Sequence, residues 1–126
     1  MFSTLISVAL GGAIGASGRY LTNVAVARTV GLGFPYGTVI ANVGGSFLMG
    51  VIVVVLARKG GNHLAPFLMT GVLGGFTTFS AFSLDTLTLF ERGALGQAGL
   101  YVGLSVGLSL GAIVLGVLAA RAVVPL

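Results

Sequence analysis

The sequence predicts an all-α integral membrane protein with four transmembrane helices. It has 126 residues, of which 56% are hydrophobic and only 6% are charged, and its mean hydropathy is +1.14. A bilayer core of about 30 Å requires roughly 20 apolar residues per helical span, so this length supplies about four spans and no separate soluble domain. We therefore expect one four-helix transmembrane domain covering residues 1–126.

The first span is expected at about residues 3–27. Gly11 and Gly15 lie four residues apart, and such a pair of small residues predicts close contact with a second helix. Arg19 lies inside the apolar run, nearer its second end. Its side chain could anchor the helix at the membrane surface or attract anions at the opening of a pore, and the sequence leaves both interpretations open.

The second span is expected at about residues 37–57, after a turn rich in glycine and proline. Thr38, Asn42 and Ser46 recur at every fourth residue, which places them on one helix face as a polar stripe. Asn42 is the costliest of the three to bury in a membrane. It could hydrogen-bond to a neighbouring helix or serve a functional site.

The third span is expected at about residues 64–90 and begins near Pro66. Gly74 and Gly75 stand at its middle, followed by Thr77 and Thr78. Glycine tolerates non-helical backbone angles, and threonine hydroxyls can replace lost backbone hydrogen bonds. The sequence therefore predicts a break in this helix at mid-membrane, and broken membrane helices commonly line a site.

Polar and aromatic residues continue beyond the predicted break. One helix face carries Phe79, Phe82, Ser83 and Thr86, which suits either packing or a functional surface. Asp85 lies about five residues before the end of the span. It could form an ion pair with Arg19, if the two spans adjoin, or act at the opening of a pore.

The fourth span is expected at about residues 95–120. Glycines recur at every fourth residue and form a ridge made of Gly99, Gly103, Gly107 and Gly111. A polar line of Tyr101, Ser105 and Ser109 runs beside it. This line could face an ion path, or its serines could simply donate hydrogen bonds to the carbonyls four residues earlier.

Composition excludes several classes of function. The chain has one histidine, two acidic residues and no cysteine, which leaves little material for acid-base catalysis or for a metal site built from side chains. Its six basic residues are dispersed, so nucleic acid is not an expected partner. We expect a protein that is not an enzyme and whose surroundings are membrane lipid.

The distribution of basic residues predicts dual topology. With four spans, Arg58, Lys59 and Arg121 lie on one side of the membrane, and Arg28 and Arg92 lie on the other. The bias that orients most membrane proteins therefore nearly vanishes. A chain without a preferred orientation can insert both ways, which predicts an antiparallel, two-fold symmetric homodimer.

Three motifs resemble the Fluc (CrcB) family of fluoride-specific ion channels. They are Gly11-Gly12 with Gly15 and Arg19, Gly37-Thr38 with Ala41-Asn42, and the sequence Gly-Gly-Phe-Thr-Thr-Phe-Ser-Ala-Phe-Ser at residues 74–83. The last is the most specific, and the match spans all four segments. The resemblance implies a dual-topology homodimer with two antiparallel pores, which exports fluoride passively from the cytoplasm across the inner (plasma) membrane of a prokaryote and so relieves fluoride toxicity.

The resemblance also implies site residues. The backbone carbonyls of Gly74 and Thr77 would bind a structural sodium ion at the centre of the dimer. The fluoride path would comprise Asn42, Phe79, Phe82, Ser83, Tyr101, Ser105, Ser109 and Thr38. Arg19 and Asp85 would lie at the pore mouth or have a structural role.

Two rival interpretations remain open from the sequence. Small multidrug transporters are similar in length and also pair antiparallel, but they need a membrane-embedded carboxylate in the first span, and this first span has none. A membrane scaffold assembled through glycine ridges would leave the polarity of Asn42, Thr77 and Thr78 unexplained, although hydrogen-bonded packing could account for it.

Overall fold

The computed structural model describes all 126 residues and is helical throughout, with no strand. The elements are α1 (Phe2–Val30), α2 (Tyr36–Lys59), the short 3-10 turn η1 (Asn62–Leu64), the π-helix η2 (Pro66–Leu73), α3 (Gly74–Phe76), α4 (Ser80–Glu91) and α5 (Leu95–Val123). The segment from η1 to α4 is the predicted third span. Every predicted span therefore coincides with a helical segment, and the boundaries agree to within three residues.

Three of the four helical segments are long and apolar enough to cross a membrane: Tyr36–Lys59, Asn62–Glu91 and Leu95–Val123. α1 is as long as α5, at 29 residues, but it is not among them. Its second half carries Arg19, Thr22 and Asn23, which lower its hydropathy. The helix predicted for the first span is confirmed, and its passage through the bilayer remains a prediction.

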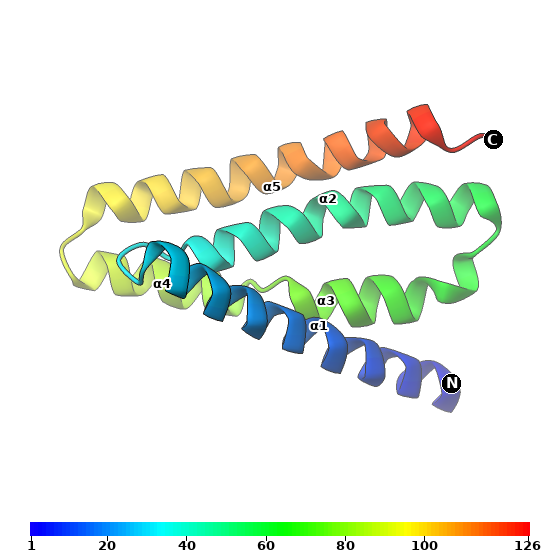
Figure 1. Cartoon of the computed structure of the whole chain (residues 1–126), viewed down its shortest axis with the longest axis horizontal. Helices are drawn as coiled ribbons and strands as arrows, with labels where there is room; N and C mark the ends of the chain where they lie inside the picture. The colour runs from blue at the N-terminus through cyan, green and yellow to red at the C-terminus, as the bar shows by residue number, and fades with distance from the viewer.

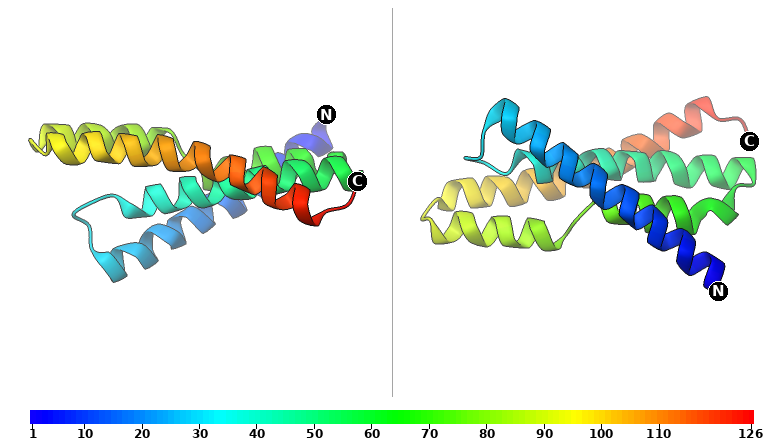
Figure 2. Two further views of the ribbon diagram at one scale, coloured as in Figure 1. Left: turned by 90° about the horizontal axis from the view of Figure 1, so that it is seen from above. Right: turned by 60° about the horizontal axis from the view of Figure 1, so that its bottom comes forward.

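The helices form an elongated bundle (Figure 1). α2 and α5 run side by side in the same direction and make the most extensive helix contact, and α4 packs against α5. α1 crosses the bundle obliquely and contacts η2 and α3 (Figure 2). Both chain termini and the α2–η1 turn lie at one end of the bundle.

Close contact between α1 and the third span depends on glycine. A Cβ atom on Gly11 would lie 2.5 Å from the Phe67 carbonyl oxygen, and one on Gly15 would overlap the carbonyl oxygen of Val72. Both glycines are buried. The close helix neighbour predicted from this small-residue pair is therefore confirmed, and it is η2.

One prediction about glycine needs correction. Gly74 and Gly75 do not break the third span, because both are helical, and the break follows them. Gly75 instead allows close packing, since a Cβ there would lie 2.7 Å from the Gly12 carbonyl oxygen. The ridge on the fourth span packs against no helix of this chain, since a Cβ at any of its four positions would meet no atom within 4 Å: Gly99, Gly103, Gly107 and Gly111.

Candidate functional site

The break in the third span lies between α3, which ends at Phe76, and α4, which begins at Ser80. Thr77 is extended, with φ −88° and ψ 154°, so the backbone here cannot continue the helical hydrogen bonds. An unpaired backbone group inside a membrane costs several kcal/mol. The predicted break is therefore confirmed, and it needs other partners for its backbone groups.

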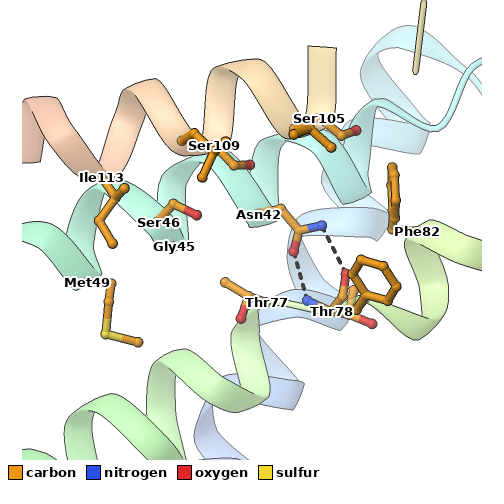
Figure 3. A pocket seen from close by; sticks show the side chains of 13 residues that line it. Asn42, Gly45, Ser46, Met49, Thr77, Thr78, Phe82, Ser105, Ser109 and Ile113 are labelled. Atoms are coloured by element: carbon orange, nitrogen blue, oxygen red, sulfur yellow. Dashed lines mark hydrogen bonds between the residues drawn. The ribbon is translucent and has the colours of Figure 1, made fainter. Parts of the chain in front are cut away.

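Asn42 supplies two of these partners from α2. Its Nδ2 donates to the carbonyl oxygen of Thr78 at 3.0 Å, and its Oδ1 accepts from the backbone N–H of Thr78 at 2.7 Å. Figure 3 shows both bonds joining the side chain to the break. One amide thus replaces both backbone partners that the missing helical turn would have given Thr78.

The two threonines of the break stabilise the ends of the flanking helices, as the sequence predicts. The Thr77 hydroxyl donates to the Leu73 carbonyl at 2.9 Å, and the Thr78 hydroxyl accepts from the N–H of Ala81 at 3.1 Å, as a helix N-cap does. The hydroxyls of Thr78 and Ser80 also lie 3.3 Å apart.

Some carbonyls at the break have no partner in the chain. Hydrogen bonds at the break use the carbonyls of Leu73, Gly75 and Thr78, and none uses those of Gly74 or Thr77. Gly74 is exposed, and Thr77 is partly exposed. These two backbone oxygens can therefore accept a donor or a cation from outside the subunit.

A pocket of about 370 Å³ opens beside the break. Residues of α2, the break, α4 and α5 line it, and Figure 3 shows most of their side chains around one space. The lining residues are Asn42, Gly45, Ser46, Met49, Thr77, Thr78, Phe79, Phe82, Ser105, Val106, Ser109, Leu110 and Ile113. None of these residues carries a charge, so any ion here would meet only neutral dipoles and aromatic rings.

Ser105 and Ser109 bring unpaired hydroxyls to this pocket. Both Oγ atoms are buried and neither has a hydrogen-bond partner. Six other hydroxyls donate to the carbonyl four residues earlier: those of Thr22, Thr29, Thr77, Ser83, Thr86 and Thr88. The alternative in which the two α5 serines bond back in this way is therefore wrong, and both hydroxyls are left without a partner in the chain.

Four aromatic side chains form a row in space from the α1–α2 loop to the break: Phe34, Tyr101, Phe82 and Phe79. Ring centroids are 5.6 Å apart for Phe34 and Tyr101, 5.3 Å for Tyr101 and Phe82, and 5.5 Å for Phe82 and Phe79. Tyr101 is fully buried, whereas 78% of Phe79 is exposed. The row of rings thus runs from the buried interior of the bundle to its exposed surface at the break.

Asp85 and Arg19 have separate partners. Asp85 Oδ2 accepts hydrogen bonds from the Thr38 hydroxyl at 2.8 Å and the Tyr101 hydroxyl at 2.9 Å, which joins α4 to α2 and α5. Arg19 Nε donates to the Gly75 carbonyl at 3.2 Å, at the C-terminal end of α3. The two side chains do not form the ion pair that the sequence allowed.

The structure brings together half of the predicted site residues around one pocket, and Arg19 and Asp85 are among those outside it. Asn42, Thr77, Phe79, Phe82, Ser105 and Ser109 line the pocket. Gly74, Thr38, Tyr101 and Ser83 lie outside it, and the exposed Ser83 donates its hydroxyl to the Phe79 carbonyl at 3.0 Å.

Several lining residues were not among the site residues predicted from sequence. Ser46 could have been predicted, because it is the third member of the polar stripe that contains Thr38 and Asn42. Met49, Leu110 and Ile113 had no signal, because an apolar residue beside a pocket looks like one that faces lipid.

The fold and the pocket define a multi-pass α-helical membrane protein with a polar site at a break in one span. The family of CrcB-like proteins, described as Camphor Resistance (CrcB), matches residues 6–117. A Cereibacter sphaeroides protein named Fluoride-specific ion channel FluC is 68% identical over 121 residues, covering 96% of this chain and 97% of that protein.

Two further relatives carry the same name. The Ruegeria sp. protein is 64% identical, over 98% of each chain, and that of Paracoccus denitrificans is 52% identical, over 96% of this chain and 97% of the relative. The chain therefore belongs to the CrcB family, which confirms the resemblance seen in its motifs. The family is one of ion channels and not of enzymes.

Proposed function

We propose that this protein is a fluoride-specific ion channel that exports fluoride passively from the cytoplasm across the inner membrane of a prokaryote, and so relieves fluoride toxicity. The names of its relatives support the choice of ion. The observation that carries the proposal is the pair of buried, unpaired hydroxyls of Ser105 and Ser109 beside the pocket. An unpaired buried donor costs free energy, and a permeant anion removes that cost each time it passes.

The lining suits a small, strongly hydrated anion. Fluoride gives up water only in exchange for good donors, and Ser105 and Ser109 offer two hydroxyls. Asn42 has a second amide hydrogen, because only one is needed for the bond to Thr78. Phe79 and Phe82 add the positive edges of their rings. Selectivity against chloride then depends on the narrowness of the path.

We assign the other predicted residues to the continuation of this path. Tyr101 lies next to the pocket residue Phe82, with ring centroids 5.3 Å apart, and the hydroxyls of Tyr101 and Thr38 both donate to Asp85. Ser83 follows Phe82 on α4. On this assignment, an ion that leaves the pocket replaces Asp85 as the acceptor for one of these hydroxyls, because each hydroxyl has only one hydrogen to donate.

The channel is proposed to be an antiparallel, dual-topology homodimer with two pores. Support comes from the outer face of α5, where Gly99, Gly103, Gly107 and Gly111 form a ridge that no helix of the same chain covers. Small residues drive helix contact in lipid because they let backbones approach closely. The exposed ring of Phe79 and the open pocket beside it would then be covered by the partner subunit.

A structural sodium ion is proposed at the centre of this dimer. The donor set fits, because a hard monovalent cation prefers oxygen dipoles, and the carbonyls of Gly74 and Thr77 have no other partner in the chain. The chain has no cluster of three or more acidic, histidine or cysteine side chains that could hold a metal ion, so backbone oxygens are the available ligands. The ion would join the two broken helices.

An anion-efflux experiment tests the function. Liposomes that contain the purified protein and potassium fluoride should release fluoride rapidly once valinomycin provides a path for potassium. Matched liposomes with potassium chloride should retain chloride. Comparable chloride release would refute the claimed selectivity, and release of neither anion would refute the channel.

A further inference from the structure

We propose that a second pocket, at the end of the bundle that carries both chain termini, binds one anionic phospholipid. This pocket has a volume of about 320 Å³ and lies between the last turns of α2 and α5. Its lining consists of Val53, Val54, Ala57, Arg58, Val117 and Arg121. It shares no residue with the pocket at the break, and it is independent of the proposed channel function.

Two guanidinium groups lie at this pocket without an acidic partner. The only acidic side chains in the sequence are Asp85 and Glu91, both on α4. α4 occupies the opposite end of the bundle in Figure 1. Arg58 and Arg121 therefore bring two positive side chains to one pocket, with no acidic side chain at this end of the bundle.

The hydrogen bonds leave donors for a phosphate group. Arg58 Nη1 donates to the carbonyl oxygens of Arg121 at 3.0 Å and Val124 at 2.7 Å, which fixes this guanidinium at the C-terminal end of α5. A guanidinium has five N–H groups, so those on Nε and Nη2 remain free. Arg121 makes no side-chain hydrogen bond within the chain and is exposed. Together the two side chains can bind the oxygens of one phosphodiester from two sides.

The apolar residues of the pocket lie where an acyl chain would begin. Val54 and Val117 precede Arg58 and Arg121 by four residues each, which is about one helical turn, or about 5.4 Å, further into the bundle. Val53 extends this apolar surface and is 42% exposed. A phosphate bound by the arginines would thus have a groove for its acyl chain directly beneath it.

A lipid fits this arrangement better than the other occupants do. A free phosphate would use the two charges but would leave the valine groove empty. In the antiparallel dimer proposed above, a second copy would bring its α4 end, with Glu91, to this side of the membrane, and a Glu91 carboxylate would meet the charges but would not fill the valine groove. Basic pockets between membrane helices typically bind anionic headgroups.

Native mass spectrometry of the purified full-length protein tests the proposal. In detergent with phosphatidylglycerol, the protein should retain one lipid per chain at collision energies that remove phosphatidylcholine. Arg121→Gln should lower the retained phosphatidylglycerol about fivefold, given the usual contribution of one basic side chain to lipid attraction. Lys59→Gln is the matched control, because Lys59 is also in the last turn of α2 but does not line the pocket, and it should retain lipid as the parent does.

Four other results decide the proposal. Val53→Phe, an exposed substitution that keeps both arginines, should also reduce retention by filling the groove, and unchanged retention would exclude an acyl chain there. Displacement of the lipid by excess inorganic phosphate would show an anion site instead. Equal losses for Arg121→Gln and Lys59→Gln, or equal retention of the two lipids by the parent, would show that the pocket is not specific for an anionic lipid.

Discussion

The pairing of Asn42 with Thr78 predicts a large stability effect from a single substitution. Asn42→Ala removes two hydrogen bonds, of 2.7 and 3.0 Å, and leaves the N–H and carbonyl of Thr78 without partners. Intramolecular hydrogen bonds contribute about 1 kcal/mol each, and those between membrane helices average about 0.6 kcal/mol. We expect the free energy of unfolding to fall by about 1–2 kcal/mol.

The assay is equilibrium unfolding in mixed micelles with sodium dodecyl sulfate, followed by circular dichroism. Ser46→Ala is the matched control, because Ser46 lies one turn further along the same face of α2, lines the same pocket and makes no side-chain hydrogen bond. It should change stability by less than about 0.5 kcal/mol.

Asn42→Asp separates the two bonds. Its carboxylate still accepts from the Thr78 N–H but cannot donate to the Thr78 carbonyl. Its second oxygen would instead face the Thr78 carbonyl oxygen, and the two would repel each other. This variant should be at least as unstable as Asn42→Ala. If Asn42→Ala costs no more stability than Ser46→Ala, or if Asn42→Asp is as stable as the parent, the two bonds to Thr78 do not stabilise the break.

Three further predictions concern packing, permeation and assembly. Gly15→Ala should destabilise the protein by about 1–3 kcal/mol in the same unfolding assay, because the added methyl group overlaps the backbone of the third span. Gly12→Ala is the control, because a methyl group there has open space and should have little effect on stability. Equal losses of stability would contradict the close contact at Gly15. Phe82→Ile should strongly slow fluoride efflux while the proposed dimer stays intact, and Phe90→Ile, on the exposed side of α4, should leave the rate unchanged. An unchanged rate for Phe82→Ile would show that this ring does not line the path. Gly107→Leu should shift the protein from dimer to monomer in analytical ultracentrifugation without loss of helix, and an unchanged dimer fraction would show that the ridge is not the interface.

The helices could be predicted from the sequence because their signals are local. Apolar runs of span length alternate with short turns marked by glycine, proline or charge, and the predicted boundaries match the helices to within three residues. The contact at Gly11 and Gly15 was predictable for the same reason, since four-residue spacing places two small side chains on one face.

The partners of the polar residues could not be predicted, because they are far apart in the chain. Asn42 and Thr78 are separated by 36 residues and Thr38 and Asp85 by 47. The sequence indicated that Asn42 needed a partner but not which one, and it offered Arg19 for Asp85 where the fold supplies Thr38 and Tyr101. The path residues that the family resemblance implies, and the sodium ion, stay predictions.

The role predicted for the glycine pair of the third span was wrong for a physical reason. The pair Gly74 and Gly75 suits a non-helical backbone as well as a close helix contact, and composition does not distinguish these uses. In the fold, Gly75 accommodates the backbone of α1 at Gly12, and the break begins only at Thr77. The same ambiguity affects the α5 ridge, because the sequence does not show whether its glycines face another helix of the chain or the outside of the bundle.

The account rests on the unpaired hydroxyls of Ser105 and Ser109 as donors to a passing anion. The most direct measurement is the fluoride efflux rate of the Ser105→Ala/Ser109→Ala double variant in liposomes, beside Thr88→Val, which removes a hydroxyl already bonded to the Leu84 carbonyl. Loss of two donors should raise the barrier enough to slow efflux about tenfold or more, and Thr88→Val should retain the parent rate. A double variant that releases fluoride at the parent rate would contradict the account.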